Sequence, residues 1–591
     1  MSVKVRLPDV HGEPGKRGES VTGKLRYVGL AGAMALACGS LAACGGGGGS
    51  TGGTATPAAV DNSAAEAAAK AAAEKAAKEA DADRLAKQAT FGPTQAVIEK
   101  IMGSGVSGWL EEQFTATGST YSDLAATPVA IGSCGSDTAC TRRNFTREQV
   151  AMRFYANALG QPDQLRQRVA FALSQLLVAS TTEVNSTAGS AAYQQILLDG
   201  AFGNYRDLLM NVTMSSYMGD YLDMADSNKT APSENFAREM MQLFSMGPDQ
   251  LNMDGTPVKD ATGATLANYT ADDIKGVARA LTGWTYARLD GAPISNNTAR
   301  DYTKPMIQNA VRYDTTAKSF LGQTVPAGAS QQDSVAAAVN AAFNNASTAP
   351  YIARFLIRHL VTANPTPGYV GRVAAVFANN GSNVRGDMKA VVRAILTDGE
   401  ARGAKPTGDN AGKVKEPVLL LTSIARIVGM TSDGYVFTTR DGNLGQPVFQ
   451  SPSVFNFYPP DFPLPGSTTL VSPASKLLTT GYAVLRSNLA YDWTIGAVNA
   501  RQEFAVNTAA ANTRGTTIDW SSWEALGTDT TAMIDRIDLL LMNRTMSSAQ
   551  KAALKAAAEA ITDVTPSLQA RKRAQAMLFA VLSSPLFQVD R

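Results

Sequence analysis

The densest group of side chains able to do chemistry lies between residues 219 and 247. Its members are Asp223, Glu234, Asn235, Arg238 and Glu239. A carboxylate in such a group can act as a general acid or base, and carboxylate and amide oxygens can hold a cation. The same residue types also make buried networks that join helices, or charged faces in contact with solvent. The pattern therefore defines a candidate catalytic or binding site with a structural alternative.

These side chains need a helix to position them, and the spacing predicts one. An apolar row recurs at helical spacing and consists of Phe236, Met240, Leu243 and Phe244. Residues four apart lie on the same side of a helix, so Glu234 is expected to pair with Arg238 and Asn235 with Glu239. Because Arg238 and Glu239 adjoin the apolar row, we expect both to be at least partly withdrawn from water.

A single histidine is the second candidate for chemistry. His11 lies in a leader described below, which leaves His359 in the mature chain and excludes a metal site built on two histidines. His359 stands in an apolar helical stretch, which favours a core residue. A Ser-His-acid triad would have to use His359, yet no nucleophile motif accompanies it. The sequence indicates no metal site and no cofactor.

An aromatic, proline-stiffened segment runs from Phe455 to Phe462. Such rings can stack on the faces of sugars, or they can fill the protein's own core. A glycine-rich run from Gly103 to Gly108 fits the spacing of a dinucleotide-binding loop. It follows a helical pattern instead of a strand, however, so it predicts a turn between two helices.

The amino terminus has the form of a lipoprotein signal. Basic residues precede an apolar stretch from Tyr27 to Ala37, which is too short to span a bilayer. Leu41-Ala42-Ala43-Cys44 follows, and this sequence resembles the lipobox of bacterial lipoproteins, in which the cysteine is lipidated. We expect an extracytoplasmic, lipid-anchored protein. The lack of an aspartate after Cys44 favours the outer membrane over the inner one.

Composition divides the chain into three parts. Residues 1–43 are the signal peptide, residues 44–83 are a glycine-rich tether and an alanine-rich helical spacer, and residues 84–591 are the folded domain. The leader holds six of the 53 basic and three of the 51 acidic residues, which leaves 47 against 48. This balance argues against a nucleic-acid partner.

Two cysteines besides Cys44 remain in the mature chain. Outside the cytoplasm, Cys134 and Cys140 are expected to form a disulfide. The bridge closes a short loop, so it should steady a local turn.

The fold class expected is mainly α: one large multi-helix domain with few or no strands. Capping boxes are predicted at Thr146–Gln149, Thr270–Asp273 and Ser547–Gln550, and Pro162 and Pro566 are predicted in first helical turns. Between about residues 430 and 475 the helical pattern lapses, which predicts a long loop rich in proline and aromatic residues.

Several long segments, taken together and in order, resemble the bacterial "domain of unknown function 1800" family over roughly residues 84–590. The segments are Thr90–Thr94 with Trp109, Arg166–Gln175, Glu234–Phe244, Ala278–Trp284, Arg385–Asp387, Lys415–Pro417 and Ser453–Phe457. The resemblance implies an exported, largely helical protein, often encoded beside a sulfatase-like or phosphatase-like secreted protein. It implies no activity. Many members have His-Asp where this chain has Tyr313-Asp314.

Two functions follow as hypotheses. The first is a cell-envelope protein of unknown molecular activity that binds or assembles an extracytoplasmic partner or glycan. The second is a glycan hydrolase that uses Glu234 and Glu239, since glycoside hydrolysis needs two carboxylates about 5–10 Å apart. Asp223 and Trp284 complete the candidate residues. A deep cleft lined by these groups would favour the enzyme, and their burial would favour a scaffold.

Overall fold

A computed structural model describes residues 63–403, 412–498 and 501–590. The chain divides into two units, Met1–Ala65 and Glu66–Arg591, and the second contains the fold treated below. Cys44, the signal peptide and the tether lie outside the described residues, so their assignment stays a prediction. Within the described residues, no helix is both long and apolar enough to cross a bilayer.

In the described residues, the folded unit begins with seven helices. They are α1 (Ser63–Ala89), α2 (Gln95–Thr115), α3 (Ser122–Ala125), α4 (Thr138–Asn144), α5 (Glu148–Gly160), α6 (Gln164–Leu176) and α7 (Thr187–Gly200). The first half of α1 is exposed, and burial begins near Ala82. This is the behaviour expected of an alanine-rich spacer that leads into a domain. Gly105, with φ of +70°, breaks α2 in two, as a turn between helices requires.

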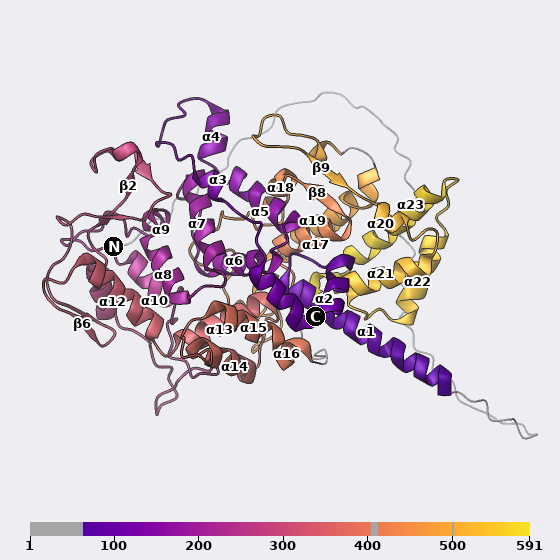
Figure 1. The fold of residues 1–591 in the computed structure, drawn as a ribbon, viewed down its shortest axis with the longest axis horizontal. Helices are drawn as coiled ribbons and strands as arrows, with labels where there is room; N and C mark the ends of the chain where they lie inside the picture. Colours follow the sequence, from indigo (N-terminus) through magenta and orange to yellow (C-terminus); the bar gives the residue numbers. More distant parts are fainter. Residues whose placement is uncertain (1–62, 404–411, 499–500, 591) are drawn as a thin grey trace, which may run out of the picture. The chain divides into compact units, whose positions relative to one another are not determined.

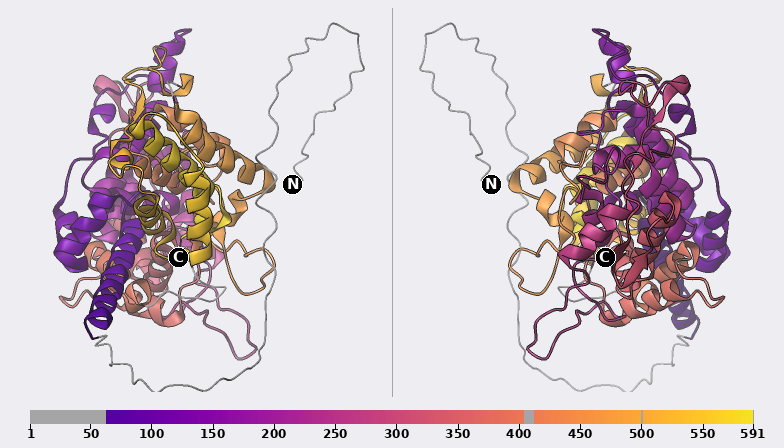
Figure 2. Two further views of the ribbon diagram at one scale, coloured as in Figure 1. Left: turned by 90° about the vertical axis from the view of Figure 1, so that its right-hand side faces the viewer. Right: turned by 90° about the vertical axis from the view of Figure 1, so that its left-hand side faces the viewer.

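The next helices and most of the strands lie together at one end of this unit (Figures 1 and 2). The helices are α8 (Tyr205–Met214), α9 (Ser216–Tyr221), α10 (Asn235–Gln242), α11 (Ala271–Ala280) and α12 (Gln331–Asn344). The strands are β1 (Trp284–Thr285), β2 (Ala287–Arg288), β3 (Arg300–Asp301), β4 (Ile307–Gln308), β5 (Lys318–Phe320) and β6 (Gln323–Val325). They form antiparallel pairs β1–β4, β2–β3 and β5–β6.

The remaining elements form the lower centre, the upper centre and the opposite end in Figure 1. The helices are α13 (Thr348–Leu360), α14 (Pro367–Ala378), α15 (Met388–Thr397), α16 (Gly399–Arg402), α17 (Pro417–Ile427), α18 (Tyr435–Asn443), α19 (Thr480–Asp492), α20 (Ser521–Glu524), α21 (Thr530–Met542), α22 (Ser548–Glu559) and α23 (Pro566–Leu582). The strands β7 (Lys413–Val414) and β10 (Val589–Asp590) pair, as do β8 (Met430–Ser432) and β9 (Thr516–Ile518). The expected mainly α domain with few strands is confirmed.

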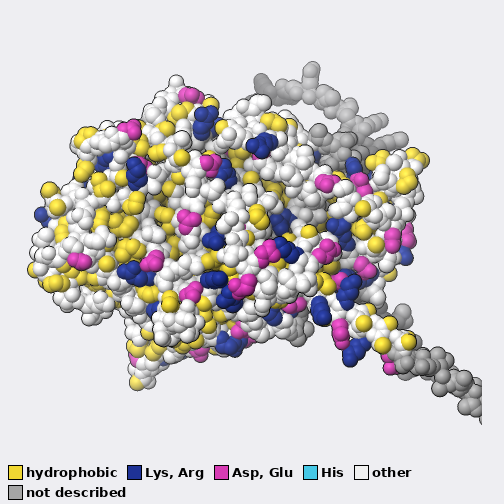
Figure 3. Space-filling model, in the orientation of Figure 1, with side chains coloured by type: hydrophobic (Ala, Val, Ile, Leu, Met, Phe, Trp, Pro, Cys, Tyr) yellow, Lys and Arg dark blue, Asp and Glu magenta, His cyan; other side chains and the backbone are white. Residues whose placement is uncertain are grey.

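One hydrophobic cluster extends from Ala82 to Phe587 and joins helices from both ends of the unit. Trp109, Trp493 and Trp523 are among its largest fully buried side chains. A small second cluster contains Phe457, Tyr458, Ala474 and Leu477. On the face shown in Figure 3, acidic and basic side chains are interspersed.

Two of the three predicted capping boxes are confirmed. Thr270 and Ser547 each accept a hydrogen bond from the third helical residue, whose own side chain accepts one in return. The third capping box, predicted at Thr146–Gln149, is wrong. Helix α5 begins at Glu148, and the side chain of Thr146 accepts a hydrogen bond from the amide of Glu148 instead. Helix α6 begins two residues after Pro162, whereas Pro566 does start α23.

The predicted loop between 430 and 475 is partly wrong, since β8 and α18 occupy its first third. No helix or strand is formed from Leu444 to Ser472, where the aromatic segment lies. The predicted bridge between Cys134 and Cys140 is confirmed, and it holds the start of α4.

Candidate functional site

A cavity opens where several distant stretches of chain meet. It encloses about 800 Å³ of empty space, solvent at its mouth included. Its walls come from the end of α6, from α13, from β7 and the residue that precedes α17, and from the aromatic loop around residues 454–474.

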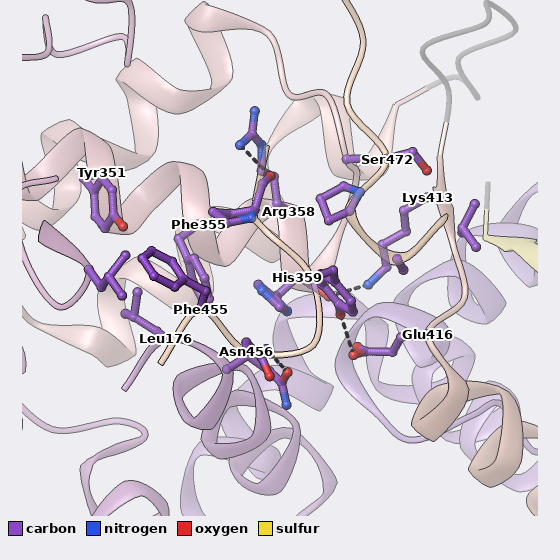
Figure 4. A pocket seen from close by; sticks show the side chains of 18 of the residues that line it. Leu176, Tyr351, Phe355, Arg358, His359, Lys413, Glu416, Phe455, Asn456 and Ser472 are labelled. Atoms are coloured by element: carbon purple, nitrogen blue, oxygen red, sulfur yellow. Dashed lines mark hydrogen bonds between the residues drawn. The ribbon is translucent and has the colours of Figure 1, made fainter. Parts of the chain in front are cut away.

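The two ends of the cavity differ in chemistry (Figure 4). Leu176, Tyr351, Phe355 and Phe455 lie at one end, and His359, Lys413 and Glu416 lie at the other. Phe455 comes from the aromatic loop, and its side chain is 49% exposed. Different residues of the loop therefore take the two roles expected of it. Phe457 and Tyr458 fill a core, whereas Phe455 faces the cavity.

Glu416 is buried at the polar end, directly before Pro417 begins α17. Its Oε2 accepts hydrogen bonds from the hydroxyl of Tyr458 at 2.8 Å and from Nε2 of Gln446 at 2.7 Å. Burial opposes the ionisation of this carboxyl. The basic side chains around it, with the bond from Gln446, outweigh burial and hold its pKa below the usual value. Glu416 is thus a carboxylate at neutral pH.

Buried cations surround this carboxylate. Arg168 in α6 is fully buried, and its Nη2 donates to the carbonyl oxygen of His359 at 2.8 Å. Its Nε and Nη1 have no hydrogen-bond partner in the part of the chain that the structure describes. Lys413 donates to the same carbonyl, and burial, with the charge of Arg168, lowers its pKa to about 8. Behind them, Lys415 pairs with Asp590 at 2.5 Å.

His359 lines the cavity between these charges and the aromatic end. Its ring packs on Phe355, with centroids 4.3 Å apart. Burial, reinforced by Lys413 and Arg168 and opposed by Glu416, lowers its pKa to about 3. The imidazole is therefore neutral at pH 7, and no hydrogen bond to it is formed within the described residues. His359 was expected in the core, and the structure places it at the wall of the cavity.

The polar residues predicted as a site around α10 are not all arranged as the sequence indicated. Arg238 pairs with Glu234 at 3.1 Å as expected, but the two side chains are 45% and 42% exposed. Asn235 donates to Asp223 at 3.0 Å instead of pairing with Glu239, and this contact is exposed as well. The expectation that Arg238 is withdrawn from water is wrong, because its side chain leans along the outer face of the helix.

Glu239 is the buried member of that group. It is 7% exposed, and its Oε2 has no hydrogen-bond partner among the described residues. Burial raises its pKa, while Arg238 opposes the rise. Trp284 is buried in β1, and its Nε1 also lacks a partner within the described part of the chain. Neither residue lines the cavity, whose nearest member in sequence is Leu243.

Reasoning from local sequence missed the polar floor of the cavity. Arg168 and Glu416 entered only as parts of segments that carried the family resemblance, Arg166–Gln175 and Lys415–Pro417. The signal that could have found them is charge in an apolar context, since each stands among residues that a core would bury. No group of three or more possible metal ligands occurs in the described residues.

The arrangement can hold a small ring between aromatic side chains and receive its polar groups at the other end. A family model described as "Protein of unknown function (DUF1800)" matches residues 84–589. Searches of curated proteins and of solved structures found no match.

Proposed function

The chain belongs to the DUF1800 family of proteins of unknown function, and from that premise we propose that it is a lipid-anchored binding protein of the cell envelope. Its cavity takes up part of an extracytoplasmic glycan or of a secreted partner. The observation that carries this proposal is the cavity itself, with an exposed ring at its mouth and hydrogen-bonding groups at its end.

A glycan is the occupant that the walls suit best. Aromatic side chains at a cavity can stack on the apolar face of a sugar ring, and Phe455, Phe355 and Tyr351 are placed to do so. The neutral imidazole of His359 and the carboxylate of Glu416 can exchange hydrogen bonds with hydroxyl groups. A protein partner, such as the sulfatase-like or phosphatase-like protein implied by the family resemblance, would reach the same mouth with a loop.

Photo-crosslinking from the cavity mouth tests the proposal. A photoreactive residue replaces Phe455 in cells, and a matched control replaces Val564, which is fully exposed on the loop before α23. We expect position 455 to capture a defined glycan or partner that mass spectrometry identifies, and position 564 to capture none of it. Equal capture at both positions, or none at 455, would contradict the proposal.

The anchor is tested separately at Cys44. Replacing Cys44 with serine should abolish incorporation of a labelled fatty acid and leave the precursor uncleaved, because the thiol is the acceptor in a lipobox. The matched control is Cys38→Ser, which removes the other cysteine of the leader, a second but less suitable candidate for lipidation, and should be lipidated like the wild type. Lipid on the Cys44→Ser protein would place the anchor elsewhere.

A second candidate function is hydrolysis of a glycan, with Glu239 and Glu234 as the carboxylates. One observation favours it: burial raises the pKa of Glu239, as a general acid requires. Release of reducing ends from envelope glycans by the wild type, and its loss in Glu239→Gln with the fold intact, would support hydrolysis. Release that persists in Glu239→Gln would remove Glu239 from this role.

A further inference from the structure

The polar end of the cavity carries more positive than negative charge. Within the described residues, Lys413 lines it on the positive side, and Glu416 is the one carboxylate among the lining residues. Directly behind, Arg168 adds a second cation, while Lys415 and Asp590 form a pair of no net charge. The set therefore has an excess of one positive charge.

Groups farther out do not remove this excess. Arg358 and Asp461 interact with each other near Tyr351, away from Glu416 and Lys413, so they leave the balance at the polar end unchanged. Behind Lys415, Lys87 and Asp83 are 2.7 Å apart and form another neutral pair. Buried charge without a counter-charge is costly, and a protein keeps it where a ligand supplies the opposite sign.

The hydrogen bonds of the cations are also incomplete. Within the described residues, Lys413 donates to the carbonyl of His359 and to no other group. Two nitrogens of Arg168 are buried and have no partner among those residues. Lysine and arginine carry three and five N–H donors, so most donors of these two side chains make no hydrogen bond in the described part of the chain.

We propose that this end of the cavity binds an anionic group, a carboxylate or a sulfate or phosphate ester, carried on the sugar ring that the aromatic end holds. Lys413 contacts the anion, and Arg168 supports it from behind. The neutral imidazole of His359 lines the same end and donates a further hydrogen bond. This inference rests on the proposed function and narrows its ligand to an acidic saccharide.

Calorimetry with matched sugars tests this inference on the purified protein. Glucuronate and glucose differ by one carboxylate, and glucose 6-sulfate and glucose 6-phosphate present the other two acids. We expect at least one acid to bind tenfold or more tightly than glucose, with an affinity that falls as salt is added. The acid that binds best identifies the anion. Equal binding of glucose and all three acids, or no binding of any acid, would overturn the inference.

Variants assign the effect to the cavity. Lys413→Met should keep the fold, because the carbonyl oxygen of His359 still accepts a hydrogen bond from Arg168. This variant should lower the affinity for the acid at least tenfold without changing the affinity for glucose. Lys413→Gln, which retains a donor for the carbonyl of His359, should act in the same direction. The control Lys304→Met removes a lysine that is 63% exposed and paired with Asp301, and it should change nothing.

Unchanged acid binding in both cavity variants would show an adventitious ion only and would overturn the inference. The proposed function is decided independently, by crosslinking from position 455. A captured neutral glycan would keep the binding function and reject the anion, whereas no capture would reject both.

Discussion

The floor of the cavity and the outer face of α10 contain similar side chains but differ in their surroundings. At the floor, Arg168 and Glu416 are withdrawn from water and have been brought together from distant parts of the chain. On α10, Glu234 and Arg238 are neighbours one turn apart and both remain in solvent. A dense run of polar residues thus indicates a surface as readily as a site. Burial is what gives a charge a large desolvation cost, which a partner or a ligand must offset.

The largest expected effect is the loss of the buried carboxylate. Glu416→Ala leaves Arg168 and Lys413 without a counter-charge and should lower the free energy of unfolding by about 3–5 kcal/mol. Glu234→Ala, its matched control on α10, should cost at most about 1 kcal/mol. Urea unfolding of both variants measures the difference. Equal losses of stability would show that the two regions do not differ in the cost of removing a carboxylate.

Acidic pH should lower the stability of the folded protein through His359. Its pKa falls from 6.5 to about 3 on folding, so between these values the unfolded chain binds more protons. The stabilisation is complete above pH 6.5 and is lost as the pH falls toward 3. His359→Gln has no such titration, so the stability of the wild type relative to this variant should decline over that window. The groups facing His359 are Glu416, Lys413, Arg168 and Arg358.

Thermal melts of the wild type and His359→Gln from pH 7.5 to 3.5 measure this decline. A constant difference between the two proteins across that range would show that folding does not shift the pKa of His359.

Glu239 should show the opposite pH dependence. Its pKa rises on folding, so the folded protein binds the extra proton above pH 4.5 and loses stability as the pH rises through the folded pKa. Glu239→Gln removes the buried charge and should be more stable than the wild type at pH 8, on the order of 1 kcal/mol. The gain should shrink toward pH 4. A variant less stable than the wild type at pH 8 would show that the carboxylate has a structural partner.

The smallest effect is expected at Arg238. Because this side chain is 45% exposed and pairs with an exposed carboxylate, Arg238→Ala should change the free energy of unfolding by at most about 1 kcal/mol. High salt should erase even that difference. A loss of several kcal/mol, measured by the same urea titrations, would place Arg238 in the core after all.

Features that depend on neighbours in sequence were predictable. The capping boxes at Thr270 and Ser547, the kink at Gly105 and the bridge between Cys134 and Cys140 each involve residues a few positions apart. Their geometry follows from local backbone chemistry, so the pattern is enough. The mainly helical fold follows in the same way, from apolar rows repeated at helical spacing.

Helix α18 could not be predicted from local sequence in this way. Its sequence from Tyr435 to Asn443 includes β-branched residues and a glycine, which are poor helix formers. Tertiary contacts supply what propensity lacks. Phe437 stacks on Tyr155 with centroids 4.7 Å apart, and Asp441 accepts hydrogen bonds from Arg147. Predicting a loop there was reasonable for an isolated peptide and wrong for a packed one.

The sequence by itself determined that the fold is mainly helical, where several of the helices begin, and that the two cysteines pair. Only the tertiary structure decided that Arg168 would meet the carbonyl of His359, 191 residues away, beside Glu416. It also decided that Glu239 would be buried while Arg238 on the same helix would not. The physical reason is that a charge is assigned its role by the dielectric and the partners around it, and these are supplied by chain distant in sequence.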